Sequence, residues 1–406
     1  MKNDELRKKI KEKILSEIDF SKDIDDEEML LRIDRNILNT CRTENISIEE
    51  KVRLRRDIFY SIRKLDVLQN LVDDKDVTEI MVNGTDNIFV EKNGRLSRYD
   101  MHFESKEKLE DVIQQIVSKC NRVVNESSPI VDARLENGSR VNVVLSPVAL
   151  NGPIVTIRRF PDSPINMKKL IEIGSIPADV SEFLQKMVVA GYNIFISGGT
   201  GSGKTTFLNA LSDSIPRDER VITIEDNAEL QILHVPNLVR LETRNANVEG
   251  CKEITVRDLI KSSLRMRPDR LIVGEVRGEE CIDMLQAMNT GHISMSTGHA
   301  NSSKDMLSRL ETMVLMGMEL PLPAVRGQIA SGIDIIVQLG RLRDKTRKLL
   351  EVSEVTGEIV DSRIEIRPLY LFRETGTDTE GRIKGEWIKE NELYCTSKLE
   401  AAGISL

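Results

Sequence analysis

The stretch that decides the fold reads Gly198-Gly199-Thr200-Gly201-Ser202-Gly203-Lys204-Thr205-Thr206. It fits the phosphate-loop pattern G-x-x-x-x-G-K-[ST], with Gly198, Gly203, Lys204 and Thr205 in register. Residues 193–197, just before it, are suited to a short buried strand, and apolar residues recur at helical spacing after it. The pattern therefore predicts a strand, a glycine-rich loop and a helix in succession.

A loop of this kind binds phosphate because successive backbone N–H groups and the N-terminus of the helix point at one spot. Its glycines allow backbone angles and a close approach that a Cβ atom would block. We expect Lys204 to reach the β- and γ-phosphates and the Thr205 hydroxyl to ligate Mg²⁺. The alternative is a glycine-rich turn that matches by chance, and the flanking strand and helix argue against it. All nine residues are therefore candidate ligands of a nucleoside triphosphate.

The length and charge narrow the class of protein. The 406 residues are enough for two or three domains with cores of their own. The chain has 58 basic and 66 acidic residues, a net charge of −8. This balance argues against a protein that coats nucleic acid, although it leaves room for a local basic patch. Nucleic acid is therefore not an expected partner.

Several features predict a cytoplasmic protein. Five scattered cysteines without a C-x-x-C pair are typical of reduced thiols. No apolar run approaches the roughly 18 residues that span a bilayer. The charged residues 1–5 are followed by no apolar segment, so we expect no signal peptide.

Changes in sequence character predict four parts. Residues 1–70 contain no proline or glycine and show helical spacing of apolar residues, which indicates about three helices. The parts are a helical N-terminal region, 1–70; an α+β domain, 71–162; a P-loop domain, 163–340; and a β-rich C-terminal extension, 341–406. The expected linker between the second and third parts contains Pro161 and Pro164.

The first 13 residues carry six basic and three acidic side chains on a helical pattern. A basic amphipathic helix can lie on a membrane or on a partner. A solvated helix face is the more common meaning of such a run, and we favour it here.

Helices alternate with buried strands in the P-loop domain, which predicts a parallel sheet. The expected strands are 193–197, 221–225, 271–274, 293–297 and 333–338. In such a sheet the ligand lies beyond the carboxyl ends of the strands.

Two of these strands end in carboxylates. Glu225 and Asp226 follow one strand, and Glu275 follows another. The Asp commonly expected before that glutamate is replaced by Gly274. We therefore expect Glu225 and Glu275 to share the tasks of holding the Mg²⁺ shell and orienting water. The alternative for either glutamate is a helix cap or an exposed strand end.

His292 and His299 flank the strand 293–297. They are seven residues apart and lack neighbouring cysteines, so they are poor zinc ligands and no zinc is expected. A hydrogen-bonding role beside a phosphate is the functional interpretation, and a satisfied core histidine is the alternative.

Several motifs together resemble the secretion ATPases that serve type II and type IV secretion, type IV pili and archaeal flagella. Glu-Asp-x-x-Glu at 225–229, the run 268–277 and the run 290–301 resemble the Asp box, Walker B and His box of that family. The segments 128–134, 138–142 and 156–160 look most like the branch that assembles Flp (tight adherence) pili. The likeness covers about residues 75–340. One departure is Ile293-Ser294, where the family commonly has Asp-Gly.

The resemblance implies a RecA-like P-loop ATPase that uses ATP and Mg²⁺. Glu275 would activate or position the attacking water, with Glu225 near the metal, and Arg140 and Arg158 match arginines that reach the γ-phosphate. A solvated sheet edge is the alternative for both arginines. The family further implies a homo-hexamer that acts on inner-membrane platform proteins from the cytoplasmic face of the membrane.

Four functions stay open at this point. The first is an ATPase that powers assembly of Flp-like pili or secretion. The second is a conjugation or type IV secretion ATPase of another branch. A DNA-acting motor of RecA type is the third, and the lack of interleaved basic and aromatic residues argues against it. The fourth is a non-hydrolysing scaffold gated by nucleotide, and the presence of Glu225, Glu275 and both histidines argues against it.

Overall fold

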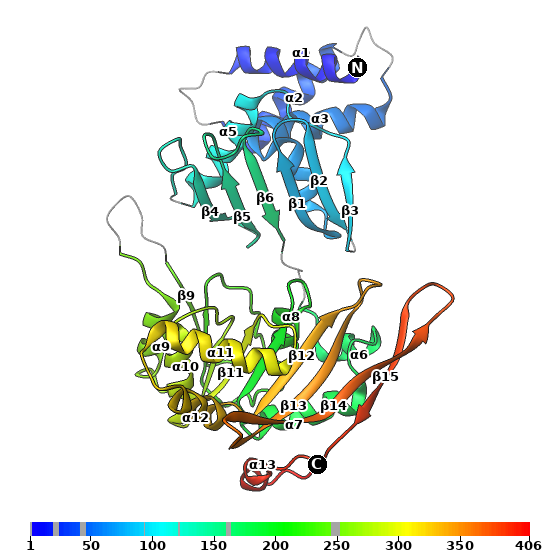
Figure 1. Cartoon of the computed structure of the whole chain (residues 1–406). Coiled ribbons are helices and arrows are strands. Elements are labelled where there is room, and N and C mark those ends of the chain that lie inside the picture. Colours follow the sequence, from blue (N-terminus) through cyan, green and yellow to red (C-terminus); the bar gives the residue numbers. More distant parts are fainter. Residues whose placement is uncertain are drawn as a thin grey trace. The chain divides into compact units, whose positions relative to one another are not determined.

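The computed structural model describes residues 2–18, 24–40, 46–92, 94–120, 122–159, 164–244 and 252–406. The chain divides into two compact units, Met1–Asp162 and Ser163–Leu406 (Figure 1). The expected proline linker lies almost wholly outside the described residues, as do Cys41 and Cys251. Each unit is described by itself below.

The first unit begins with three helices: α1 (Lys2–Glu17), α2 (Asp26–Thr40) and α3 (Ile48–Arg63). Ile10, Ile33 and Ile58, one from each helix, are among the buried residues of a small shared core. The apolar stripe of α1 is therefore used inside this bundle. The solvated face that we favoured holds only in part, because Arg7 and Lys11 are largely covered and pair with Asp66 and Glu104. Ser47 caps α3, because its side chain accepts a hydrogen bond from the backbone N–H of Glu50.

A six-stranded antiparallel sheet completes the first unit, in the order β3-β2-β1-β6-β5-β4. Successive side chains of a strand point to opposite faces of the sheet, and one set, which includes Val141 and Val143, packs into a core shared with α5. The remaining elements of this unit are η1 (Asp66–Leu68), α4 (Gln69–Asp73), β1 (Val77–Asn83), β2 (Asn87–Lys92), β3 (Arg95–Tyr99), α5 (Lys106–Lys119), β4 (Ile130–Arg134), β5 (Arg140–Val144) and β6 (Ile154–Arg158).

The second unit is built on a nine-stranded sheet with the order β15-β14-β13-β12-β7-β11-β10-β8-β9. The strands from β12 to β9 run parallel to one another, whereas β13, β14 and β15 are added antiparallel. The strands are β7 (Ile194–Gly198), β8 (Val221–Glu225), β9 (Leu238–Glu242), β10 (Arg270–Val273), β11 (Ile293–Gly298), β12 (Ile335–Arg341), β13 (Arg347–Val360), β14 (Arg363–Thr377) and β15 (Ile383–Lys389).

All five strands expected from the sequence are present, and they are the parallel centre of this sheet. The fold class, an α/β P-loop domain preceded by an α+β region and helices, is confirmed. Two features were not foreseen. β9 extends one edge of the sheet, and the C-terminal strands β13–β15 continue the same sheet at its other edge.

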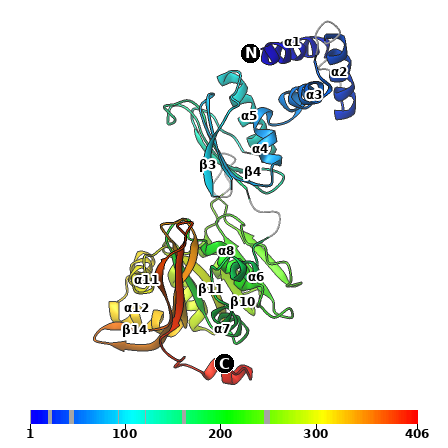
Figure 2. The same ribbon diagram turned by 90° about the vertical axis from the view of Figure 1, so that its right-hand side faces the viewer.

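Helices cover both faces of the sheet. One face is covered by α6 (Met167–Glu172), α7 (Ala178–Val189) and α8 (Lys204–Ser212). The other is covered by α9 (Val256–Ser263), α10 (Glu280–Asn289), α11 (Ser303–Gly317) and α12 (Leu322–Gly332). Figure 2 shows α11 and α12 on the opposite side of the sheet from α6, α7 and α8. A last short helix, α13 (Ser397–Ala402), follows β15.

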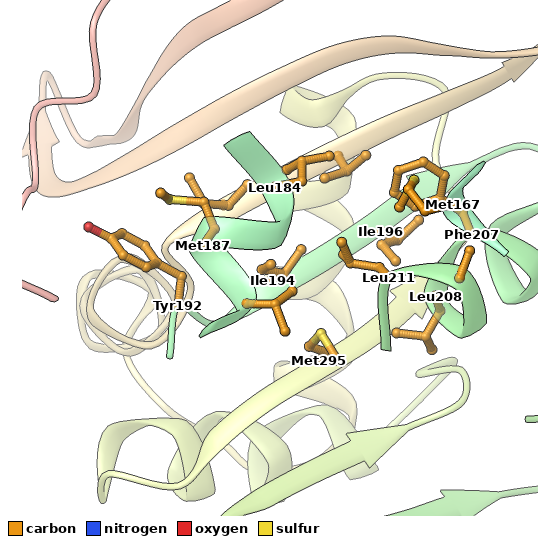
Figure 3. Close-up of a cluster of buried hydrophobic side chains, with 14 of the residues drawn as sticks. Met167, Leu184, Met187, Tyr192, Ile194, Ile196, Phe207, Leu208, Leu211 and Met295 are labelled. Atoms are coloured by element: carbon orange, nitrogen blue, oxygen red, sulfur yellow. The ribbon is translucent and has the colours of Figure 1, made fainter. Parts of the chain in front are cut away.

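The P-loop is anchored by the core between α7, α8 and the central strands (Figure 3). Leu184 of α7, Ile194 and Ile196 of β7, and Leu208 of α8 are fully buried there. Burying side chains of this size stabilises the fold by about 1.5–3 kcal/mol each. The loop between β7 and α8 is thus held at both ends by rigid elements. Across the described residues, we find no helix long and apolar enough to cross a membrane.

Candidate functional site

The nine predicted residues form one loop and the first turn of α8. β7 ends at Gly198, and α8 begins at Lys204 after Gly203, whose φ of 92° favours glycine. Gly201 is also left-handed, with a φ of 71°. A Cβ at Gly198 would lie 2.7 Å from the carbonyl oxygen of Leu339, so this position has no room for a side chain. The glycines are therefore required by backbone geometry and packing.

Lys204 is almost buried beneath this loop, with 7% of its surface exposed. Its Nζ donates to the carbonyl oxygen of Gly199 at 3.3 Å and lies 3.2 Å from Nδ1 of His299. Burial lowers the pKa of Lys204, and the negative charge of Glu275 opposes this effect. An ammonium held here is ready to contact phosphate oxygens.

Glu275 follows β10, and its carboxylate lies between the side chains of Arg277 and His299. Its Oε2 accepts a 2.6 Å hydrogen bond from Arg277, and its Oε1 lies 2.7 Å from Nε2 of His299 in a close polar contact. Burial lowers the pKa of His299, and the positive charge of Lys204 lowers it further. A neutral imidazole can accept from Lys204 through Nδ1 and turn its Nε2–H to the carboxylate. Donor and acceptor groups thus alternate along a continuous line of four side chains, which are Lys204, His299, Glu275 and Arg277.

Glu225 lies at the carboxyl end of β8, beside Gly274. Only 3% of its surface is exposed, and burial raises its pKa to about 7. A Cβ at Gly274 would lie 2.9 Å from Cγ of Glu225, so an aspartate there would collide with this side chain. Position 274 therefore has no room for the usual Asp, because the side chain of Glu225 occupies that space.

The carboxylate of Glu225 also has a structural task. Its Oε1 accepts hydrogen bonds from the backbone N–H groups of Glu229 and Leu230, at 2.8 and 3.0 Å. No helix begins at these residues, so this contact holds a loop and is not the helix cap that we considered as the alternative. Its Oε2 is buried, and no described residue donates a hydrogen bond to it. One oxygen thus anchors the following loop, while the other keeps its capacity to bind a ligand.

The site has the chemistry that a magnesium ion requires. Mg²⁺ prefers oxygen ligands and commonly uses one or two carboxylates with phosphate oxygens and water. Thr205, at the start of α8, offers a hydroxyl, and Glu225 and Glu275 offer carboxylates. Within the described part of the chain, Oε2 of Glu225 is a buried oxygen without a hydrogen-bond donor, whereas Oε1 of Glu275 faces Nε2 of His299. These residue types fit the ion.

The two histidines lie at opposite ends of one strand. β11 runs parallel to β7, so its carboxyl end, next to His299, lies at the P-loop. His292 precedes the strand and lines a cavity of about 670 Å³ at the other end, together with Asp334 and Lys398. Within one chain, six strand residues, about 20 Å, separate His292 from His299. The expectation of a phosphate-side role is therefore not met for His292 within a single chain.

Arg140 and Arg158 belong to the first unit, where they are direct neighbours across the β5–β6 pair. Val141 and Ile157 beside them point into the core, so both arginines lie on the opposite face of the sheet. Arg134 continues the row on β4. The sequence thus placed two arginines on one sheet face, and their role toward phosphate stays a prediction.

Two arginines near the P-loop were missed as individual site residues. Arg277 bonds to Glu275 and lies 3.7 Å from the carboxylate of Asp226. Its position two residues after the glutamate was the available signal. Arg347 donates through Nε to the carbonyl oxygen of Gly201 at 2.9 Å. It is 146 residues away in the chain, so no local pattern could have linked it to the loop.

Comparison with known proteins identifies the family of the chain. Residues 62–387 match the type II/IV secretion system protein family. A putative conjugal transfer protein of Mycobacterium tuberculosis is 34% identical over 294 residues, 71% of this chain and 83% of that protein. The probable conjugal transfer protein TrbB of Sinorhizobium fredii is 31% identical over 325 residues, 77% of this chain and 95% of that protein.

A solved structure shares the fold. The crystal structure of the pilus retraction motor PilT with bound ADP covers 70% of this chain and 81% of its own, with a TM-score of 0.52 and 20% identity. At this identity the likeness concerns the fold alone. The family-level resemblance seen in the sequence is confirmed, whereas the Flp-pilus branch stays a prediction. The chain therefore belongs to the type II/IV secretion system protein family.

Proposed function

We propose that this chain is a ring-forming motor that hydrolyses Mg²⁺-ATP and uses the energy to drive pilus assembly or secretion. The observation that carries the proposal is the line of contacts from Lys204 through His299 and Glu275 to Arg277. It joins a phosphate-binding lysine to a carboxylate that can orient water. A protein that only binds nucleotide does not need the second half of this arrangement.

Each residue of the line has a task in phosphoryl transfer. Lys204 and the loop amides bind the β- and γ-phosphates. Glu275, held in place from both sides, orients the attacking water, and neutral His299 keeps this carboxylate and the lysine in a fixed relation. Thr205, Glu225 and Glu275 would hold Mg²⁺, which supplies positive charge to the phosphate oxygens. Arg277 keeps the carboxylate of Glu275 from swinging toward solvent.

Arg140 and Arg158 are proposed as further cations for the γ-phosphate. Such arginines are worth on the order of 10³-fold or more in phosphoryl transfer. Their neighbouring positions on one sheet face support a joint role. We propose that the chain works as a homo-hexamer, with its sites near subunit boundaries, so that these arginines complete a site within or between subunits.

The transported cargo defines two candidate functions. The motifs at 128–134, 138–142 and 156–160 favour assembly of Flp-like pili, with inner-membrane platform proteins as partners and the cytoplasmic face of the membrane as the place of action. The names of the curated relatives, conjugal transfer proteins, favour a conjugation system as the second candidate. A pull-down with candidate platform proteins of each system would separate them.

The experiment that tests the proposal is steady-state ATP hydrolysis at rising protein concentration. The wild type is compared with Glu275→Gln and with Glu386→Gln, a control on the exposed face of β15. We expect specific activity to rise with concentration, to vanish in Glu275→Gln and to persist in the control. Salt-dependent binding of DNA together with flat activity would favour the DNA-acting motor instead.

A further inference from the structure

The β12–β13 hairpin extends past the end of β7 at the P-loop. Leu339 of β12 is paired with Gly198 of β7, and the hairpin continues for two more residues before it turns. Arg341, the last residue of β12, is directly opposite Arg347, the first residue of β13. The hairpin therefore carries two exposed arginines to the same place.

Both arginines reach the tip of the phosphate loop. Arg347 donates through Nε to the carbonyl oxygen of Gly201. Its Cδ lies 3.4 Å from the position that a Cβ would take at Gly203, so its chain passes closely over the loop. An NH1 atom of Arg341 lies 3.8 Å from the corresponding position at Gly201. Both arginine side chains thus lie against the glycines at the tip of the loop.

Hydrogen bonds to Ser175 hold the backbone around Arg347 in place. Its carbonyl oxygen accepts a 2.8 Å hydrogen bond from the Ser175 hydroxyl, and the carbonyl oxygen of Ser175 accepts from the N–H of Leu349 at 2.9 Å. Lys348, next in the chain, points to the other side and donates to the carbonyl oxygen of Gly174. A side chain on such a held backbone loses little freedom when it binds a ligand.

The charge of these two arginines is not balanced locally. Their neighbour Arg343 is paired with Glu374, and Asp344 accepts from the backbone of Ile383. No carboxylate of the described residues forms an ion pair with Arg341 or Arg347. Like charges directly opposite each other across two strands destabilise a sheet. We therefore expect the repulsion between the two arginines to be relieved by a bound anion.

We propose that Arg341 and Arg347 bind the phosphate chain of the nucleotide at the tip of the P-loop, and that Arg347 also positions the loop. The inference rests on the proposed function, because it names further residues of the same nucleotide site. Arginine suits this task, since its planar guanidinium forms paired hydrogen bonds with phosphate oxygens.

The positioning part follows from peptide geometry. In a planar trans peptide, the carbonyl of Gly201 and the N–H of Ser202 point in opposite directions. Arg347 fixes the carbonyl of Gly201 and therefore the orientation of the whole Gly201–Ser202 peptide, whose N–H donates to the carbonyl oxygen of Gly199 at 3.3 Å. The arginine thereby stabilises the tight turn of the loop between Gly199 and Ser202.

Equilibrium binding to the full-length chain tests the proposal without relying on catalysis. The probes are ADP and inorganic pyrophosphate, and the variants are Arg341→Gln, Arg347→Gln and the double variant. Each lost hydrogen bond to a charged group should weaken binding of both probes about tenfold or more. Arg343→Gln is the matched control, since it removes an arginine of the same hairpin that Glu374 already pairs. Its affinity should stay within about twofold of the wild type.

The outcomes are distinguishable. Unchanged affinity for both probes in the double variant, or an equal loss in Arg343→Gln, would overturn the inference and leave the proposed function standing. Weaker binding of ADP with unchanged binding of pyrophosphate would also overturn it, because the arginines would then contact the nucleoside. A wild type that binds neither probe would refute both. The fluorescence of Trp387, on β15, verifies that each variant is folded.

Discussion

The buried carboxyl group of Glu225 should make the second unit less stable as the pH rises. Its pKa is raised by burial from an ordinary value of 4.5 to about 7. The folded chain therefore keeps this proton over a range in which the unfolded chain has lost it. For an acid of this kind, stability falls as the pH rises from the unfolded pKa to the folded pKa, and the loss is complete above the folded pKa.

The size of the effect follows from the two pKa values. One proton held over about 2.5 pH units corresponds to a loss on the order of 3 kcal/mol in the free energy of unfolding. The sequence pI is near 5.4, so measurements begin at pH 6 to avoid precipitation. By the same linkage, about 1.4 kcal/mol of the loss lies between about pH 6 and about pH 8.5.

Glu225→Gln removes the titration while keeping an oxygen that can accept from the N–H groups of Glu229 and Leu230. The difference in stability between variant and wild type should therefore shift in favour of the variant by about 1.4 kcal/mol between about pH 6 and about pH 8.5. This comparison cancels any pH-independent cost of the new amide. Urea unfolding followed by Trp387, which is the chain's single tryptophan, reports on the second unit alone.

The measurement is made without nucleotide or Mg²⁺, because either would interact with this carboxylate. Glu386→Gln, at an exposed position of β15, serves as the control and should parallel the wild type at every pH. A constant difference between Glu225→Gln and wild type across the pH range would refute the reasoning. Glu225 would then titrate in the folded chain as it does in the unfolded one.

Other predictions follow from single contacts. Lys204→Ala should abolish ATP turnover, measured as phosphate release, because it removes the cation of the loop; turnover at the wild-type rate would contradict its role. Gly198→Ala should abolish ADP binding, since its Cβ would lie 2.7 Å from the carbonyl oxygen of Leu339, and calorimetric binding at wild-type affinity would show that the strand can shift. Ser47→Ala should destabilise the N-terminal helices by about 1 kcal/mol, because the cap on Glu50 is lost. Faster amide hydrogen exchange in α3 is the expected result, and unchanged exchange would argue against the cap.

Local patterns in the sequence were sufficient to predict the centre of the second unit. The glycine loop, the strand before it and the helix after it are specified by residues adjacent in the chain, so Lys204 and Thr205 could be placed without a structure. Glu275 could be placed because parallel strands bring their carboxyl ends together. The same rule separates the two histidines, since His299 follows its strand and His292 precedes it.

Features that depend on strand register could not be predicted. The contact of Arg347 with Gly201 requires that β12 lie next to β7 and that the hairpin turn after Arg341, which no local pattern encodes. The fit of Glu225 against Gly274 requires that β8 and β10 be neighbours. The C-terminal strands were recognised as strands, but their place in the same sheet follows only from pairing over long distances.

Each unit contains a pair of arginines on neighbouring strands, and we have proposed that both pairs bind nucleotide phosphates. Arg140 and Arg158 are directly opposite across β5 and β6, and Arg341 and Arg347 are directly opposite across β12 and β13. In the first unit Arg158 is also directly opposite Glu79 on β1, so negative charge is already present there. In the second unit Arg341 and Arg347 bring two positive charges together on the sheet, which costs up to about 1 kcal/mol without an anion. A bound polyphosphate would relieve this repulsion, and hydrolysis would remove part of the compensating charge. We therefore expect the pair formed by Arg341 and Arg347, as well as the phosphate loop, to link nucleotide state to structure.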